Sequence, residues 1–476
     1  MELQNKIEGF KGEFLHPSLD IKDNILILGF RYKSSSGKDE SLILVVKGGG
    51  IRIVKEDSFL DGEKEYFLEK KGRSLIRIQE RWDLTDINQL IEDYSNLKIE
   101  RPNPQKLFED IKNTIKRYVE LEKEIDYSLV AAWIIGTYFH PIFSAYPFLN
   151  PKAPKRSGKS QLLNLLRQLC FNAVKARPTL AALGDTVDAL RGTYLIDQSD
   201  SLSRKGGEEL LDILADSYKR GGGKRRMVQI ENGKRQMLEH ETYSPKVFAS
   251  IRELPEDLLD RCLIVPLIRS QRNFLDPDED NEIWREIRAR IYKFLIEDYS
   301  AVETEYAVRK MEYKRSSEIV GRTLELWLPF ETILRRVSVV EEELMEAKKR
   351  FMSQYGFAEY EPSELEIAVI EAILEKIGNA ENTVLAPRQI AENISVDCFH
   401  DSPTPKQAAA RVGWAIKKFN LSSEKKSRTR EGVCYLFEKS KVEHIHHTYF
   451  PTQPAYNEKN EMNPNENVDV GIGVSI

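Results

Sequence analysis

Three residues have the types and spacing needed to hold a phosphate chain: Gly158, Lys159 and Ser160. They follow an apolar run at 146–150 and precede the helical pattern QLLNLLRQL, so we expect a strand, a loop and a helix in this order. A glycine lets backbone N–H groups approach an anion, the lysine reaches the terminal phosphates and the serine hydroxyl joins Mg²⁺. The helix beginning near Gln161 directs the positive end of its dipole toward the same anion.

The loop before these residues completes a phosphate-binding pattern, GxxxxGK[ST], in all but its first glycine. Ala153 stands at that position, and the loop continues through Pro154, Lys155, Arg156 and Ser157. With strand and helix in place, the pattern predicts ATP and Mg²⁺ as cofactors. The alternative is a basic surface turn that contains the same letters.

A second apolar run, at 193–197, ends in Asp197, as a buried parallel strand with a metal-binding carboxylate would. Together with Ser160, this aspartate is the expected Mg²⁺ ligand. Gln198 follows, and an amide cannot accept a proton from water near neutral pH. Asp200 lies two residues further on and is either a replacement base or a helix N-cap.

A third expected strand, at 246–250, ends in Ser250, which could sense a terminal phosphate. Arg261 follows Asp260, directly before another apolar run at 263–267. An exposed arginine at this point could reach a nucleotide held by a neighbouring subunit and neutralise transition-state charge. The alternative is a surface arginine paired with Asp260.

Between the second and third of these strands lies a predicted hairpin with Asn232-Gly233 at its turn. Its arms carry basic residues at both ends: Lys224, Arg225, Arg226, Lys234 and Arg235. Cationic side chains on a flexible tip can follow a phosphate backbone without reading its sequence. The alternative is a hairpin exposed only to solvent.

The elements that must position these residues form a multi-domain α/β protein. Alternating strand-like and helix-like runs over 145–268 indicate a mostly parallel sheet with crossover helices. The predicted parts are a β-rich domain (1–95), a helical linker (96–144), an ATPase core (145–275), a helical lid (276–357), a block of three helices and a basic wing (358–445), and a disordered tail (446–476).

The block at 358–445 resembles a winged-helix domain, a helix-turn-helix variant. Its third helix ends in Lys417-Lys418, and its wing carries Lys425, Lys426, Arg428 and Arg430. Such residues favour phosphate contacts with little sequence specificity. Winged helices also bind proteins, so this alternative stays open.

Length and composition agree with a soluble multi-domain chain. The chain has 476 residues, 31% of them charged, and a formal net charge of −5. Its four cysteines are too far apart for a CxxC zinc or redox site, and a reducing, cytoplasmic setting is expected. The uncharged run from 127 to 151 could span a bilayer by length, but its two prolines favour a buried helix followed by a buried strand.

The ordered motifs LNPKAPKRSGKSQLLNLL, TYLIDQSDSL, YSPKVFASIRELPEDLLDRCLIVPL and GRTLELWLPF resemble those of AAA+ ATPases of mobile genetic elements, akin to superfamily 3 and MCM-type replicative helicases. The similarity covers about 128–335. It implies Walker A roles for Lys159 and Ser160, Walker B for Asp197, sensor 1 for Ser250, the arginine finger for Arg261 and sensor 2 for Arg322. Ala153, Gln198 and Ser250 depart from the family pattern.

The resemblance further implies a DNA helicase or translocase that forms a ring, expected to be a hexamer, with ATP between subunits and the basic hairpin in the pore. DNA, and a primase or initiator protein, are the implied partners. Two other functions remain open: an ATP-binding replication initiator or scaffold with little hydrolysis, which Gln198 favours, and an ATP-dependent DNA-binding regulator.

Overall fold

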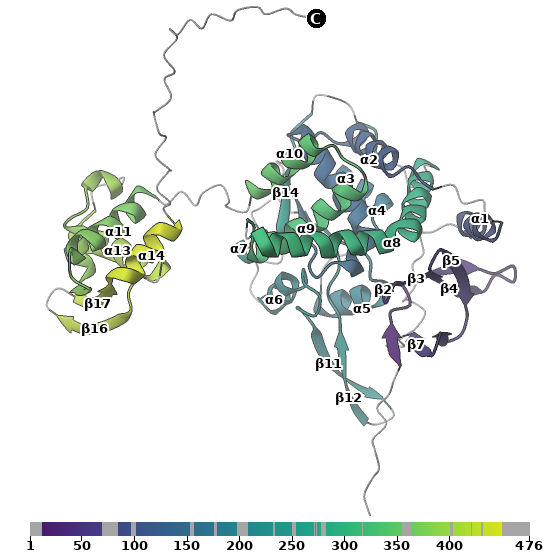
Figure 1. Ribbon diagram of the computed structural model, residues 1–476, viewed down its shortest axis with the longest axis horizontal. Coiled ribbons are helices and arrows are strands. Elements are labelled where there is room, and N and C mark those ends of the chain that lie inside the picture. The colour runs from purple at the N-terminus through teal and green to yellow at the C-terminus, as the bar shows by residue number, and fades with distance from the viewer. Residues whose placement is uncertain are drawn as a thin grey trace, which may run out of the picture. The chain divides into compact units, whose positions relative to one another are not determined.

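The computed structural model describes residues 12–68, 84–96, 101–152, 157–175, 179–197, 208–231, 234–249, 254–270, 272, 274–277, 282–316, 318–354, 363–399, 403–419, 421–429 and 432–449. By their contacts the residues divide into two compact units, Met1–Tyr355 and Gly356–Ile476. Each unit is described by itself (Figure 1).

The first unit begins with two small sheets. One is antiparallel, with the order β2-β3-β4-β5; the other has the order β1-β7-β6. Both faces of the longer strands, β3 and β4, are buried, one in the main core of the unit and the other in a smaller apolar cluster, and their apolar and β-branched side chains favour strands. The elements are β1 (Glu13–Leu15), β2 (Leu19–Lys22), β3 (Ile25–Lys33), β4 (Asp39–Lys47), β5 (Gly50–Val54), β6 (Ser58–Asp61), β7 (Lys64–Leu68) and the helix α1 (Leu84–Ser95).

The centre of the first unit is a five-stranded parallel sheet with the order β14-β8-β13-β10-β9. Its inner strands are short apolar runs, buried on both faces as parallel strands are. The strands are β8 (Phe148–Lys152), β9 (Val174–Lys175), β10 (Tyr194–Asp197), β13 (Lys246–Ala249) and β14 (Cys262–Pro266). Because all five run the same way, their carboxyl ends meet at one edge of the sheet.

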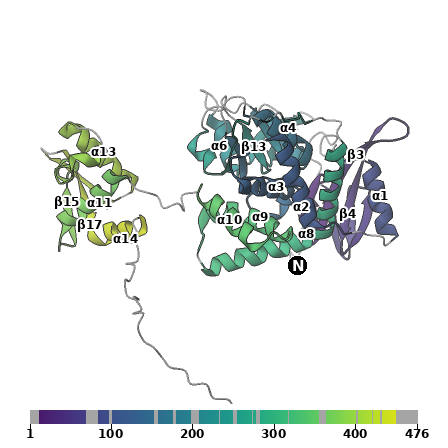
Figure 2. The ribbon, with the colours of Figure 1, turned by 90° about the horizontal axis from the view of Figure 1, so that it is seen from above.

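Helices surround this sheet (Figure 2). They are α2 (Pro104–Tyr118), α3 (Glu124–Phe139), α4 (Lys159–Leu169), α5 (Leu180–Leu190), α6 (Glu208–Asp216), α7 (Glu256–Leu259), α8 (Glu282–Ser316), α9 (Gly321–Arg336) and α10 (Glu341–Met352), with a 3₁₀ turn, η2, at His140–Ile142. α3 is buried from Ile125 to Phe139, so the uncharged run is an internal helix followed by β8. None of the described helices is both long and apolar enough to cross a bilayer.

The long helix α8 joins the central part of the unit to the N-terminal sheet. The hydroxyl of Tyr299, near its middle, donates to the carbonyl of Asn24 at 2.9 Å and lies 3.3 Å from that of Val46. Asp298, on the same helix, accepts two hydrogen bonds from Arg336 of α9. These contacts hold α8, α9 and the β2-β3-β4-β5 sheet together.

A two-stranded antiparallel hairpin, β11 (Arg225–Glu231) and β12 (Lys234–His240), projects from the body of the first unit (Figure 1). It pairs with no other sheet among the described residues. The turn residues Asn232 and Gly233 lie outside the described residues, but the register Glu231↔Lys234 places a two-residue connection there, as the Asn-Gly signal predicts.

The second unit packs three α-helices against a small sheet and a last helix. They are α11 (Glu364–Ile377), α12 (Pro387–Ala391), α13 (Pro405–Lys418) and α14 (Lys439–Tyr449), with a 3₁₀ turn, η4, at Val396–Phe399. The strands β15 (Asn382–Leu385), β16 (Glu424–Thr429) and β17 (Gly432–Glu438) form a sheet with the order β15-β17-β16. Three helices followed by a hairpin is the order that the sequence predicts for 358–445.

The region 1–95, expected to be β-rich, contains β1 to β7 and also the amphipathic helix α1, which buries Ile87 and Leu90. In the expected helical linker, residues 119–123 separate α2 from α3. One local expectation is wrong. The segment 446–449, expected to be disordered, closes α14, whose Val442 and Ile445 pack into the core of the second unit.

Candidate nucleotide site and nucleic-acid interface

The predicted phosphate-binding residues lie at the start of α4, directly after the loop that leaves β8. Gly158 is the N-cap of α4 and has φ = +84°, a left-handed conformation that glycine adopts without steric cost. Lys159 and Ser160 form the first turn of the helix, and Ser160 is exposed. Free N–H groups at this helix end therefore face the space beyond the sheet, where an anion is favoured.

One buried polar atom at this loop has no hydrogen-bond partner among the described residues. It is the hydroxyl oxygen of Ser157, whose side chain is 6% exposed. A buried hydroxyl without a partner is costly, so a ligand oxygen at this position would satisfy it. A left-handed glycine, a helix N-terminus and an unsatisfied hydroxyl together fit a bound phosphate chain. Residues 153–156, the remainder of the predicted loop, lie outside the described residues.

A pocket of about 320 Å³ opens beside this loop. Its walls come from the segment that follows α2, from the loop and α4, and from the segment that follows β14: Val119, Glu120, Ser157, Gly158, Gln161, Ile268, Ser270, Arg272 and Phe274. The volume falls in the range of small-molecule sites. Apolar side chains on one wall and an arginine on another suit a flat heterocycle joined to an anionic group.

Asp197 ends β10 at the same edge of the sheet. It pairs with Ala249 on β13, and β13 in turn pairs with β8 through Val247 and Leu149. With neighbouring strands about 4.8 Å apart, only about 10 Å separates β10 from β8. Asp197 and Ser160 are thus placed at one edge of the sheet, as a shared Mg²⁺ requires.

Asp197 also has a partner that the sequence did not reveal. The ammonium of Lys175, on the edge strand β9, lies 3.1 Å from Asp197 Oδ2. Both side chains are about one-third exposed. The carboxylate predicted to bind Mg²⁺ is therefore paired with a lysine, which a cation at this position would have to displace.

The structure does not place several of the residues predicted for this site. Gln198, Asp200 and Ser250 lie outside the described residues, so their roles stay predictions. No group of three or more His, Cys, Asp or Glu side chains that could hold a metal ion occurs within the described ranges. This leaves Ser160 and Asp197 as the proposed Mg²⁺ ligands, with phosphate and water oxygens completing the usual octahedral shell.

Arg261 was expected to be exposed, and this expectation is wrong. Its side chain is only 8% exposed, its guanidinium lies 5.3 Å from the centre of the Tyr218 ring, and it donates to the carbonyl of Asp257. Its backbone carbonyl accepts from Phe148 at 2.8 Å, at the start of β8. The residue therefore lies at the amino edge of the sheet, the length of a strand away from the phosphate loop.

Arg322 lies at the same amino edge. It is exposed at the start of α9 and donates to Asp260 Oδ2 at 3.1 Å. Five residues of β8 separate this edge from the phosphate loop, which is about 17 Å of strand. Neither arginine can therefore contact a nucleotide bound to its own chain without a large movement.

The predicted DNA-contacting residues at the base of the hairpin are present and partly paired. Lys224 and Arg226 both contact Glu239, at 2.5 and 3.1 Å, so two cations share one carboxylate. Arg235, near the tip, is exposed and has no ion-pair partner among the described residues. Of Lys234 only the backbone is described.

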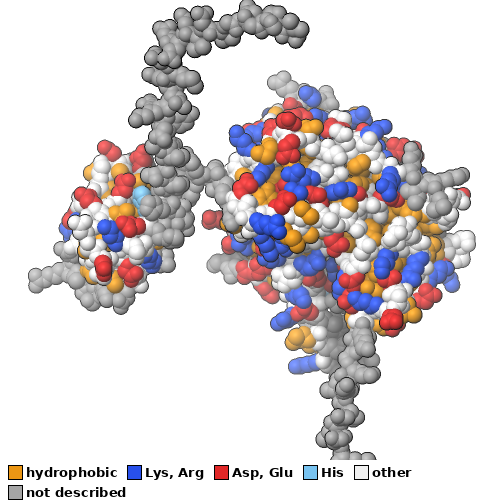
Figure 3. Space-filling model, in the orientation of Figure 1, with side chains coloured by type: hydrophobic (Ala, Val, Ile, Leu, Met, Phe, Trp, Pro, Cys, Tyr) orange, Lys and Arg blue, Asp and Glu red, His pale blue; other side chains and the backbone are white. Residues whose placement is uncertain are grey.

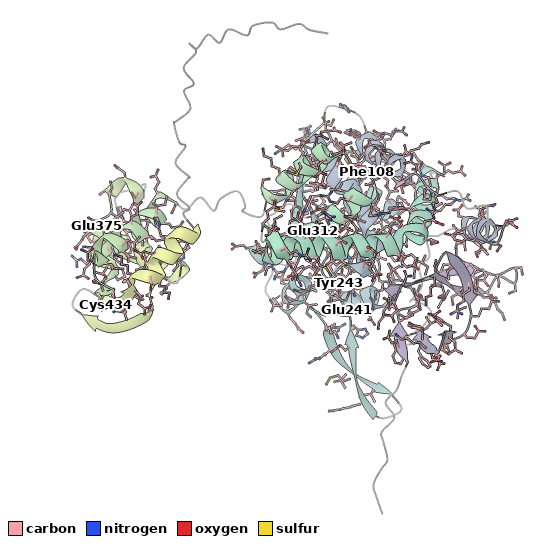
Figure 4. All side chains as sticks on the ribbon, viewed as in Figure 1. Phe108, Glu241, Tyr243, Glu312, Glu375 and Cys434 are labelled. Carbon is pink, nitrogen blue, oxygen red and sulfur yellow. The ribbon has the colours of Figure 1, made fainter. Side chains whose placement is uncertain are left out.

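The base of the hairpin is anchored to the body of the unit (Figure 4). Tyr243 donates to the carbonyls of His140 and Phe143 at 2.9 and 3.0 Å, and the carboxylate of Glu241 accepts from the backbone N–H of Gly221 and Tyr243. The buried ammonium of Lys246 donates to the carbonyls of Thr242 and Ser244. Burial lowers the pKa of Lys246 to about 7.

In the second unit, Lys417 is exposed near the end of α13, on a face that also exposes Lys406, Gln407, Ala410 and Trp414. For Lys418, Lys425, Lys426 and Arg428 the structure places only the backbone, in α13 and β16. Arg430 lies outside the described residues. A DNA-binding role for this face stays a prediction.

Sequence reasoning missed Lys175, Ser157 as an unsatisfied hydroxyl, and the pocket walls around Val119 and Phe274. Lys175 is 22 positions before Asp197, and only the pairing of β9 with β10 brings the two together. The sequence offered one weak signal, the β-branched Val174 directly before Lys175. The pocket walls are 155 positions apart and become neighbours only when the sheet forms.

Comparisons with known proteins add little. The chain matches no protein-family model and no curated protein sequence. Among solved structures, it is similar to the "A form apo structure of NrS-1 C terminal region-CTR", with 10% identity, a TM-score of 0.33, and coverage of 87% of this chain and 96% of that one. A second structure of that region, residues 305–718, gives 12% identity, a TM-score of 0.32, and coverage of 83% and 94%. Similarity this weak carries no argument about function, so the interpretation rests on the residues of this chain.

Proposed function

We propose that the protein is an ATP-dependent, ring-forming DNA translocase or helicase that serves the replication of a mobile genetic element. The observation that carries the proposal is the placement of Gly158, in a left-handed conformation at the N-terminus of α4, on the sheet edge where Asp197 also ends. A phosphate chain held by backbone N–H groups and a carboxylate for its metal ion are the two parts that nucleotide hydrolysis needs.

The position of the two arginines supports an oligomer. Arg261 and Arg322 lie at the amino edge of the sheet, away from the phosphate loop of their own chain. In a ring of identical chains, the amino edge of one subunit can face the carboxyl edge of the next. Each ATP then lies between two copies, bound by Lys159, Ser160 and Asp197 of one and reached by Arg322 and Arg261 of the other.

For Arg261 this assignment requires a rearrangement. Its guanidinium must leave Tyr218 and the carbonyl of Asp257 before it can enter a neighbouring site. Arg322 is already exposed and needs only to exchange Asp260 for phosphate oxygens. We therefore propose Arg322 as the first contact between subunits, and Arg261 as the residue that follows once the interface closes.

Bound Mg²⁺ would neutralise charge on the terminal phosphates. In this chain, the N–H groups at the start of α4 bind and orient the phosphate chain, the Lys159 ammonium neutralises it, and Asp197 holds the metal ion. Asp200 would accept the proton of the attacking water, since Gln198 cannot.

Nucleotide binding tests the proposal directly. Lys159→Ala should abolish tight binding of a fluorescent ATP analogue, and Lys314→Ala, which removes the same charge from an exposed position on α8, should bind as wild type does. If the wild-type chain binds no adenine nucleotide, or if Lys159→Ala binds it unchanged, the proposal fails.

Gln198 favours a second function, an ATP-binding replication initiator or scaffold with little hydrolysis. A positioned general base contributes about 10²–10⁴-fold to rate, and its loss would leave a nucleotide-dependent switch. Steady-state ATPase with and without DNA separates the two functions. A DNA-stimulated rate that falls in Asp200→Asn indicates a motor; ATP binding with negligible turnover indicates the scaffold.

A further inference from the structure

The β11–β12 hairpin has two different faces, and one of them carries three large apolar side chains between charged ends. Across the hairpin, Val228 pairs with Met237, Ile230 with Arg235, and Arg226 with Glu239. Because side chains alternate along each strand, these six residues share one face of the ribbon.

The apolar face consists of Val228, Ile230 and Met237, and these side chains are far from buried. Their exposed fractions are 58%, 69% and 72%. Figure 3 shows hydrophobic side chains between basic ones on the projecting hairpin. Leaving large apolar side chains on an exposed ribbon lowers its stability, and a clustered apolar patch usually marks a binding surface.

The charge around the apolar face indicates which partner it meets. The segment 224–240 has five basic and two acidic residues, in a chain whose net charge is negative. Two copies of this face placed tip against tip would bring their Arg235 side chains together, and like charges repel. A polyanion has the opposite charge and is attracted to the same ends of the face.

We propose that the apolar face packs against the bases of single-stranded DNA, while Arg235 at one end and Lys224 and Arg226 at the other contact its phosphates. This inference rests on the proposed function, because it names the strand state of the DNA that the hairpin holds. Bases in a duplex are stacked and paired, and their faces cannot meet Val228, Ile230 or Met237. In a single strand the faces are free, and packing against protein side chains is tolerant of sequence.

The experiment measures the affinity of the 476-residue chain, in the presence of a non-hydrolysable ATP analogue, for three fluorescent probes. The probes are an oligothymidylate of about 20 nucleotides, an abasic oligomer of the same length, and a duplex. The test variant carries Val228→Thr, Ile230→Thr and Met237→Gln, which keep strand-compatible, uncharged side chains. The matched variant is Arg235→Gln. Because these side chains are exposed, unchanged thermal unfolding serves as the folding control.

We expect wild type to bind oligothymidylate at least about five-fold more tightly than the abasic oligomer. The triple variant should lose most of this difference without changing the salt slope. Arg235→Gln should weaken both oligomers alike and reduce the salt slope by about one unit.

Three results would overturn the inference: equal affinity of wild type for the two oligomers, preference for the duplex, or a triple variant that weakens both oligomers equally. A change in oligomeric state of the triple variant would also overturn it and assign the face to a second copy. In each of these cases the proposed function still holds if the wild-type chain binds and hydrolyses ATP. Absence of nucleotide binding would instead remove the function itself.

Discussion

The guanidinium of Arg322 lies 3.1 Å from Asp260 Oδ2, across 62 positions of sequence. Asp260 is the neighbour of Arg261, so the contact brings Arg322 close to Arg261, and we propose that both arginines act on the nucleotide of a neighbouring subunit. That place is the amino edge of the parallel sheet, whereas the phosphate loop leaves the carboxyl edge. This placement at opposite edges supports our proposal that a second copy of the chain completes each nucleotide site.

A mixing experiment tests this arrangement. Lys159→Ala and Arg322→Ala should each lose DNA-stimulated ATPase, with an arginine of this kind worth about 10³–10⁵ in kcat. Mixed oligomers, however, contain interfaces in which an intact Lys159 meets an intact Arg322, so the mixture should regain measurable activity. No recovery in mixtures that demonstrably co-assemble would place both residues in the same site of one chain.

Gly158→Ala should weaken ATP binding through the backbone. At φ = +84° an alanine is strained, by about 1–2 kcal/mol, and its Cβ would lie 3.3 Å from Gln161 Oε1. Gly37→Ala is the matched control, because Gly37 also has a positive φ of +76° but nothing lies within 4 Å of its added Cβ. Thermal unfolding should show similar losses for both variants, and titration with an ATP analogue should show a loss only at Gly158.

Lys175→Met should change the metal requirement. The variant removes the ammonium that lies 3.1 Å from Asp197 and so frees the carboxylate for a cation. We expect half-maximal ATPase at a several-fold lower Mg²⁺ concentration, with the effect shrinking as salt is added, since both side chains are partly exposed. Lys219→Met, which breaks the ion pair with Glu325, should leave the Mg²⁺ dependence unchanged. A higher Mg²⁺ requirement in Lys175→Met would indicate that Lys175 contacts the nucleotide instead.

His140 should make the first unit sensitive to acid. Burial lowers the pKa of its imidazole from 6.5 to about 3, and Nδ1 lies 2.9 Å from the carbonyl of Thr137. Between these pH values the unfolded chain binds a proton that the folded chain does not, so the stability present above pH 6.5 is lost as pH falls. The slope is about 1.4 kcal/mol per pH unit.

Urea unfolding of wild type and His140→Asn, at neutral and acidic pH, measures this effect. The asparagine keeps a donor near Thr137 but does not titrate. The free energies of unfolding should therefore converge as pH falls from 6.5 toward 3. Parallel curves would show that His140 is already protonated in the folded chain.

The local strand–loop–helix around Gly158 was predictable because it depends on residues close together in sequence. The same holds for β10 ending at Asp197 and for the hairpin register set by Asn232-Gly233. The Lys175–Asp197 pair and the burial of Arg261 against Tyr218 were not predictable, since each depends on strand order and on the packing of distant elements. An arginine that follows an aspartate can be either exposed or buried. Arg261 is buried because Tyr218, in the turn after α6, covers it.

The geometry of β13 has a mechanical consequence. This strand has four residues, pairs with β10 on one side and β8 on the other, and begins directly after the anchored segment around Tyr243. The carboxyl end of this strand, about 13 Å away, lies at the edge of the sheet where we propose that the nucleotide binds, and its other end carries the base of the hairpin. A strand paired on both sides resists stretching and bending. If the proposed site binds a nucleotide, a displacement there would be transmitted along β13 to the base of the hairpin.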